Sequence, residues 1–350
     1  MPDYVTINTR VRSMEGELLN EGQLRELVSF PELSSAVNCL RKTIYGLYFP
    51  EGIDEPLINK TDIALRTSLS ESMYKIITLL NRSDSSLIDA LLGRWDVCNI
   101  KTLLRGKLNN IPVQEVLSAT VPAGSLDALL IEEIYRQPSV QAILDMLLTI
   151  WCAYVAPIIR IRYLQEGDLF RGEVELEKAF FLNALRQLNA YGEKGINSVL
   201  VKDVISMLID RYNLIASIKI SEEGIGEDDA LIYFIEGGKL ISFETYKKIT
   251  RCRNINECLY MIDSVTWKTH WERFSSQSRI TIPALLVERW MDYEMSTHAI
   301  RILRDAPLNI GLVISYIWRK TNEVINLRTI LRGIYFNIPQ HEIENLLLIV

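Results

Sequence analysis

Acidic and amide side chains that could share a polar site occur three times along this sequence of 350 residues. In each copy the acid precedes an asparagine by three residues, so the two side chains share one helix face, and a cation follows. The nine positions are Asp96, Asn99 and Arg105; Asp210, Asn213 and Lys219; and Glu323, Asn326 and Arg332. Catalysis needs different residue types that converge at one place. Because triplication supplies the same types three times, we interpret the motif as structural, a polar edge that holds a repeated helix junction.

Familiar catalytic and ligand-binding patterns are missing from the sequence. Gly237-Gly238-Lys239 lacks the spacing and the hydroxyl of a phosphate-binding loop, so it is interpreted as a turn. Trp267 and Trp271 have a helical spacing that is typical of a core. The histidines lack the i,i+4 pairing of a zinc site, so surface or packing roles are expected. They are His270, His298 and His341. The sequence therefore predicts no enzyme activity, no cofactor and no metal.

Composition limits the class of protein and partner. Hydrophobic residues make up 48% and charged residues 23%, as in globular proteins with a large core. A net charge of −6 argues against a nucleic-acid groove. Met1–Gly16 lacks the apolar segment of a signal peptide. The cysteines show no CxxC spacing, which favours a reduced, cytosolic setting; they are Cys39, Cys98, Cys152, Cys252 and Cys258.

One uncharged stretch, Met146–Ile159, tests whether the chain spans a membrane. It is bounded by Asp145 and Arg160 and contains Pro157. As a helix it would reach about 21 Å, whereas a hydrocarbon core is roughly 30 Å thick. A buried core helix is predicted, with no direct membrane span.

The elements that carry the motif are predicted to be helices of a triplicated unit. Asn99–Val116 and Asn326–Ile343 align without a gap, and a third copy begins at Asn213, so the interval is about 114 residues. Apolar residues follow the asparagine by one, four and five positions, the face by which a helix packs on its neighbours. They are Ile100, Leu103 and Leu104, and again Leu327, Ile330 and Leu331.

The junction after each motif helix is predicted from its turn residues. A cation in the last turn and a following glycine are expected to end the first helix, at Gly106 and Gly333. The Asn-Ile-Pro sequences that begin at Asn110 and Asn337 are then expected to start the next helix, with asparagine as its cap. The repeat is therefore a helix, a short turn and a second helix.

Elsewhere the apolar spacing is also helical, and the fold class is predicted to be all-α. The clearest helical stretches are Tyr4–Tyr45, Glu175–Leu188 and Gly311–Arg332. Loops are expected at Pro50–Pro56, Ser83–Ser86, Glu166–Gly172 and Glu222–Asp229. The best strand candidate is Ala230–Ile235, which periodicity does not separate from a helix.

The third copy lacks the segment that follows the other two. Gly124-x-Leu126 and Gly238-x-Leu240 open that segment in the first and second copies, and Gly22-x-Leu24 resembles them near the start of the chain. The N-terminal helices are therefore expected to complete the third unit, which would close a pseudo-threefold funnel or ring with neighbouring termini. The expected units are residues 1–136, 137–262 and 263–350.

Taken together, these motifs resemble a known family. Asn326-Leu327-Arg328, with Glu323-Val324 before it and Ile330–Gly333 after it, resembles the C-terminal signature of the C subunits of V/A-type rotary ATPases, which are relatives of the d subunit of the eukaryotic V-ATPase. Supporting features are Tyr4, Thr9–Met14, Leu18-Leu19, Asp96, Asn99–Lys101 and Arg105–Lys107. Departures are Arg319–Asn322, where the family carries a denser acidic run, and Lys219 in place of arginine. The Thr321-Asn322 change puts detailed surface contacts in doubt, not the fold.

The resemblance implies a funnel of three similar helical domains on the cytoplasmic face of a membrane proteolipid ring. Such an adapter receives the rotor shaft, subunits D and F, and transmits torque between ATP hydrolysis or synthesis and ion translocation without catalytic residues of its own. The alternative is an unrelated α-helical repeat scaffold that binds another protein. The two differ in closure, because an open solenoid keeps its ends apart.

Overall fold

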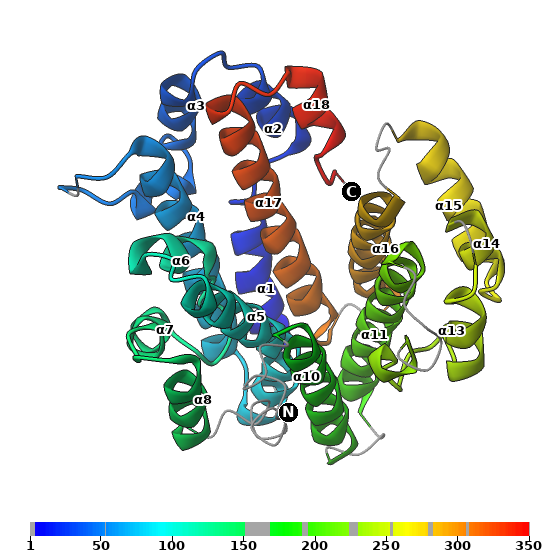
Figure 1. Ribbon diagram of the computed structural model, residues 1–350. Coiled ribbons are helices and arrows are strands. Elements are labelled where there is room, and N and C mark those ends of the chain that lie inside the picture. Colours follow the sequence, from blue (N-terminus) through cyan, green and yellow to red (C-terminus); the bar gives the residue numbers. More distant parts are fainter. Residues whose placement is uncertain are drawn as a thin grey trace.

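The computed structural model describes residues 4–52, 54–150, 169–190, 195–223, 230–252, 255–278, 283–305 and 308–349. Within these ranges the regular elements are helices and no strand occurs, which confirms the all-α prediction (Figure 1). The strand candidate contains a short 3-10 helix, η3 (Leu231–Tyr233). Many helices begin with a side chain that accepts a bond from a free backbone N–H of the first turn. Such caps are Asn20, Asn81, Asp127, Ser139, Ser242 and Ser264.

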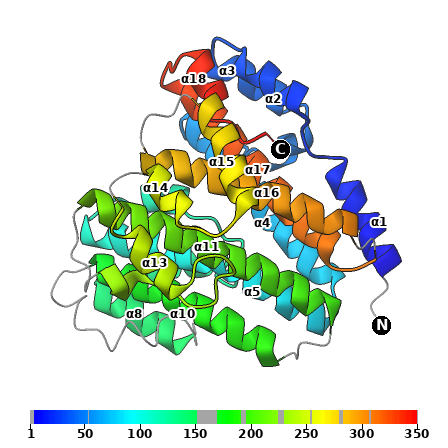
Figure 2. The same ribbon diagram turned by 90° about the vertical axis from the view of Figure 1, so that its right-hand side faces the viewer.

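Six long helices form a closed cycle of contacts. They are α4 (Leu57–Leu79), α5 (Arg82–Leu108), α10 (Leu169–Ala190), α11 (Ile196–Glu223), α16 (Pro283–Asp305) and α17 (Gly311–Tyr335). Each packs on the next in this order, and α17 packs on α4. Figure 2 shows these helices stacked with similar directions. The cycle is therefore closed, unlike an open solenoid.

Short helices cover the outside of the long ones (Figure 1). On α5 lie α6 (Val113–Ala119), α7 (Ala128–Tyr135) and α8 (Val140–Thr149). On α17 lie α18 (Gln340–Asn345), α2 (Glu21–Val28) and α3 (Leu33–Leu40). Near α11 and α16 lie α13 (Phe243–Ile249), α14 (Ile255–Tyr260) and α15 (Val265–Gln277). Because α2 contacts α18 as α7 contacts α6, the N-terminal helices have contacts on α17 that correspond to those of α7 and α8 on α5.

The two ends of the chain meet through helices. Helix α2 contacts α18, close to the C-terminal end of the chain. Helix α1 (Tyr4–Glu15) packs along α17, and its first residue lies near the beginning of α17 (Figure 1). There the Asn197 side chain donates to the Tyr4 hydroxyl (2.6 Å) and accepts from the backbone N–H of Ile310 (3.2 Å). The expected proximity of the termini therefore holds for α2 and α18 and does not extend to the first residues of α1.

The predicted ends of the motif helices are wrong by several residues. The helices continue past Gly106 and Gly333, and the left-handed residues that end them are Asn110 (φ 53°) and Asn337 (φ 55°). Asparagine tolerates this conformation better than most residues with a Cβ. These asparagines therefore stop one helix and do not cap the next.

Both glycines of the motif have a packing role instead. A Cβ on Gly106 would lie 2.5 Å from Cγ2 of Val116, and one on Gly333 would lie 2.6 Å from Cδ1 of Ile343. Real Cβ atoms do not approach other atoms this closely, so glycine is what lets α6 and α18 fold back against α5 and α17. Close approach of two elements is a common reason for glycine inside a helix.

Other sequence expectations had mixed outcomes. The apolar motif face is confirmed, because its six residues are at most 1% exposed. The predicted loop at Ser83–Ser86 is wrong, because Asn81 caps α5 and these residues are helical. Two other predicted loops are partly helical. Residues 169–172 of Glu166–Gly172 belong to α10, and residues 222–223 of Glu222–Asp229 belong to α11. The other residues of both stretches lie outside the described residues. Of Met146–Ile159, residues 151–159 also lie outside them.

Candidate functional site

The three motif asparagines are buried and hold a distant backbone segment. Asn99 Nδ2 donates to the carbonyl of Val121 (2.7 Å), and Asn99 Oδ1 accepts from the N–H of the same residue (2.8 Å). The pairing recurs at the same separation of 22 residues, between Asn213 and Ile235 and between Asn326 and Leu348. Each asparagine is at most 2% exposed. An amide suits this task because it donates and accepts at once.

The two motif aspartates accept hydrogen bonds from the backbone of a turn that lies 29 to 31 residues further along the chain. Asp96 accepts from the backbone N–H groups of Ser125 (3.0 Å) and Leu126 (2.9 Å) and from the Ser125 hydroxyl (2.7 Å). Asp210 accepts from three consecutive N–H groups at 2.9 Å each, those of residues 239–241. Burial raises the pKa of both carboxyls, and these hydrogen bonds oppose the rise.

Two glycines make this approach possible. A Cβ built on Gly124 or Gly238 would lie 2.3 Å from Oδ1 of Asp96 or Asp210. Because no side chain fits there, the Gly-x-Leu pattern seen in the sequence marks the backbone that the motif acid binds.

The third copy uses a glutamate and takes its partners from the N-terminal segment. Glu323 accepts from the backbone N–H of Leu19 (2.6 Å) and from the Tyr45 hydroxyl. Lys320 lies 3.2 Å from Glu323 and 2.9 Å from the Tyr45 hydroxyl. In the third copy, the turn that corresponds to Gly124-x-Leu126 is therefore at Leu19. The sequence comparison had matched this turn to Gly22-x-Leu24, which is wrong by several residues.

The motif cations each form an ion pair with the next pair of long helices. Arg105 on α5 pairs through two nitrogens with Glu173 on α10. Lys219 on α11 pairs with Glu288 on α16 at 2.9 Å. Arg332 on α17 pairs with Asp62 on α4 at 2.8 Å, and Arg328 adds a contact to the same carboxylate at 3.1 Å. The cations therefore link neighbouring helix pairs around the cycle.

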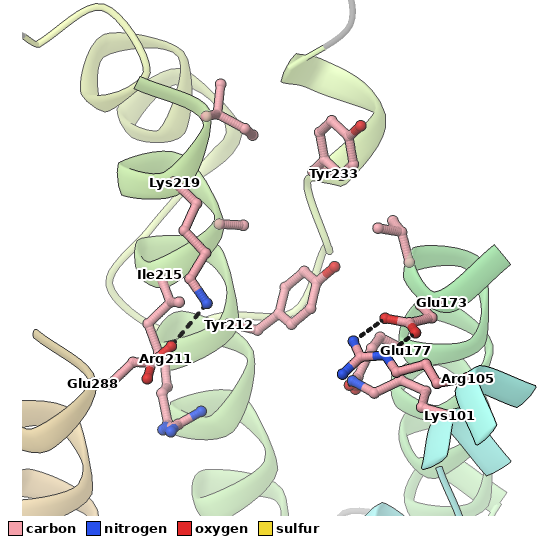
Figure 3. Close-up of a pocket in the computed structure, with 13 residues that line it drawn as sticks. Lys101, Arg105, Glu173, Glu177, Arg211, Tyr212, Ile215, Lys219, Tyr233 and Glu288 are labelled. Atoms are coloured by element: carbon pink, nitrogen blue, oxygen red, sulfur yellow. Dashed lines mark hydrogen bonds and ion pairs between the residues drawn. The ribbon is translucent and has the colours of Figure 1, made fainter. Parts of the chain in front are cut away.

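Two of these ion pairs line a cavity of about 260 Å³ between α5, α10, α11 and α16 (Figure 3). Figure 3 shows Arg105 and Glu173 on one side, Lys219 and Glu288 on the other, and Tyr212 between them. Burial raises the pKa of the Tyr212 hydroxyl well above its usual value.

The glutamates that line this cavity are all paired with cations. Besides the two motif pairs, Glu177 binds Lys101 at 2.6 Å. A general base needs a carboxylate that is free to take a proton, whereas these carboxylates are held by cations. Among the described residues no group of His, Cys, Asp and Glu could hold a metal ion. The arrangement is suited to joining helix pairs.

Comparison with known proteins decides the family. The sequence model described as "ATP synthase (C/AC39) subunit" matches residues 7–346. The chain is 26% identical to the C subunit of the V-type ATP synthase of Thermus thermophilus over 98% of its own length and 97% of that protein. It is 26% identical to the C subunit of the A-type ATP synthase of Methanococcoides burtonii (99% and 94% covered) and 23% identical to that of Pyrococcus abyssi (98% and 90%). The chain belongs to the ATP synthase (C/AC39) subunit family.

In this member of the C/AC39 family, the two tryptophans and His270 have packing contacts, and His341 lies on the surface. Trp267 and Trp271 meet Trp290 edge to face at 5.3 and 5.4 Å between ring centroids, so the predicted core role is confirmed. His270 contacts the buried Glu294 at 2.9 Å, and His341 is exposed. The part of the chain that the structure describes contains no helix long and apolar enough to cross a membrane.

The sequence reasoning missed the acids that receive the motif cations in this C/AC39 chain. They are Asp62, Glu173 and Glu288, all within two turns of the start of a long helix. A usable signal existed, because Arg105 and Lys219 precede their acids by nearly equal distances, 68 and 69 residues. The apolar residue 22 positions after each asparagine was a second one.

Replacing any motif asparagine with alanine is expected to lower the free energy of unfolding by roughly 2 to 4 kcal/mol. The change leaves a buried N–H and carbonyl without partners, each costing about 1 to 3 kcal/mol. Urea denaturation of Asn99→Ala, Asn213→Ala and Asn326→Ala would measure it. The exposed Asn189→Ala on α10 is the control, with an expected change within about 0.5 kcal/mol. Losses no larger than that of the control would contradict a structural role for these amides.

Proposed function

We propose that this chain is a non-catalytic central-rotor adapter of a V/A-type ATPase. It links the rotor shaft, subunits D and F, to the membrane proteolipid ring on the cytoplasmic side and transmits torque between ATP hydrolysis or synthesis and ion translocation. Membership of the C/AC39 family supports this proposal, as do the relatives named as C subunits of A-type and V-type ATP synthases.

The observation that carries the proposal is the closed cycle of six long helices with an ion pair at each of three junctions. An element that transmits torque must resist shear between its parts. Close-packed apolar cores deform little, and a charged pair at each junction fixes the register of neighbouring helices. A closed cycle also distributes a tangential load over three equivalent seams.

We propose three units within this cycle. Each consists of one pair of long helices with the short helices that cover its motif helix, and α2 and α3 complete the third unit. The hydrogen bond from Leu19 to Glu323 supports this assignment, since it takes the place of the bonds that Asp96 and Asp210 accept. The contacts of α8 with α5 favour including α8 in the first unit, beyond residue 136. A pseudo-threefold funnel follows from this division.

The closed contacts disfavour the alternative of an unrelated repeat scaffold. An open solenoid leaves its first and last repeats unpartnered, whereas α17 packs on α4 and α18 packs on α2. Membership of the C/AC39 family also disfavours an unrelated scaffold, and it rests on the sequence and not on these helix contacts.

Reconstitution of the rotary complex with and without this chain tests the proposal. With the chain, we expect the shaft subunits and the proteolipid ring to co-purify and ATP to drive ion uptake into proteoliposomes. Without it, we expect the catalytic head to hydrolyse ATP while ion uptake is lost. Full ion uptake without the chain would show that it is not the mechanical link.

A further inference from the structure

A second cavity, of about 360 Å³, lies where α15, α16 and the C-terminal segment meet. Arg273 and Phe274 border it from α15, and Leu347 and Leu348 border it from the C-terminal segment. Asn326 fixes that segment through its two hydrogen bonds to Leu348. The wall is thus held in place by the same motif that organises the fold.

The charged side chains among the described lining residues of this cavity are all basic. Arg273, Arg289, Arg301 and His270 line it, and among its described lining residues there is no aspartate or glutamate. His270 contacts one acid, Glu294, which is 4% exposed and lies 2.9 Å from its Nδ1. Within the described chain, no acid forms an ion pair with the three arginines. This differs from the first cavity, where the glutamates neutralise most of the positive charge.

Helix α16 presents its lining residues along a single face. Arg289, Tyr293, Thr297 and Arg301 follow one another at intervals of four residues, and residues so spaced are neighbours on a helix surface. The Thr297 hydroxyl is buried and has no hydrogen-bond partner.

We propose that this cavity binds a soluble molecule that carries two or more phosphoryl groups. The planar guanidinium group matches phosphate oxygens with two parallel hydrogen bonds. Arg289 and Arg301 on α16 and Arg273 on α15 all line the cavity, so it offers more than one guanidinium group to a ligand with more than one anionic group. The volume falls in the range of small-molecule sites, roughly 300 to 1,000 Å³, and Phe274 and Leu347 can cover an apolar portion.

Calorimetric titration of the full chain with pyrophosphate and with ADP tests this assignment. We expect both to bind, and we expect Arg289→Gln and Arg301→Gln each to weaken binding about tenfold or more, because a charged hydrogen-bond donor is lost. Arg10→Gln, an exposed arginine on α1, is the matched control and should leave the affinity unchanged. Circular dichroism establishes that each variant is folded, and a ligand-dependent rise of the thermal midpoint gives a second readout.

Three results would overturn the proposal. The first is no binding of either compound at concentrations up to ~1 mM. The second is binding that both arginine variants leave unchanged. The third is binding to phosphatidic acid vesicles alone, which would identify a lipid headgroup and not a soluble molecule as the source of the phosphoryl group. Since the isolated chain suffices for these titrations, their outcome is independent of the rotor-adapter proposal.

Discussion

Glu323→Ala is expected to lower the free energy of unfolding by about 3 to 5 kcal/mol, since it leaves a buried cation without its partner. Lys320 and Glu323 have side chains that are 3% and 4% exposed, and Tyr45 beside them is fully buried. The change also removes the acceptor of the Leu19 N–H, which joins the N-terminal segment to α17. Urea denaturation at pH 7 would measure the loss. A matched double variant, Lys320→Met with Glu323→Leu, removes both charges and should cost less than Glu323→Ala alone.

The same variant should show a distinctive pH dependence. Burial lowers the pKa of Lys320, and the charge of Glu323 opposes that shift, so removing Glu323 lowers this pKa further. Where the unfolded chain binds more protons than the folded chain, stability increases as pH rises. The deficit of Glu323→Ala relative to the natural chain should therefore shrink between pH 7 and about pH 9.5. A loss below about 1 kcal/mol, or a deficit independent of pH, would contradict a buried ion pair.

The sequence predicted the part of the fold that depends on local pattern. Apolar spacing identified the buried face of α5 and α17 correctly, because an i, i+3, i+4 pattern has one structural meaning. Helix ends were predicted less well. Gly106 was predicted to be the stop signal, but its lack of a Cβ allows contact with Val116, and the stop is at Asn110. Local propensity does not separate these uses of glycine, since close approach is decided by tertiary packing.

The candidate site was recognised as a motif, but its partners were not. Asp96 and Asn99 both bind backbone groups, which any residue offers, so the apolar residue 22 positions after each asparagine is the sequence trace of these contacts, and it identifies a partner only when the three copies are compared. The recurring interval of 68 and 69 residues pointed to Glu173 and Glu288, whereas Asp62 is identified only once α4 is known to follow α17 around the closed cycle. The basic cavity has the same origin, because the packing of α15 on α16 is what places Arg273 and Arg289 in the lining of one cavity.

Leu331→Asp is expected to abolish most ATP-driven ion pumping by the assembled complex while leaving ATP hydrolysis by the separated catalytic head intact. Leu331 is fully buried on α17, the helix that contacts both α16 and α4 and so closes the cycle. A carboxylate without a partner in that core costs about 4 kcal/mol or more, which is a large fraction of the stability of a typical domain. The measurement is ion uptake into proteoliposomes beside ATPase activity of the isolated head.

A graded series separates mechanical coupling from simple loss of the chain. Leu331→Met conserves volume and should cost less than about 1.5 kcal/mol, whereas Leu331→Ala should cost about 2 to 5 kcal/mol. Pumping is expected to fall in the order Met, Ala, Asp. Ile325→Asp places the same charge on the same helix at an exposed position and should pump normally. Unchanged pumping by Leu331→Asp would refute the packing role of α17. Equal loss of head hydrolysis would place the effect outside the proposed adapter role, because a rigid link between shaft and ring would act on coupling and not on the chemistry of the head.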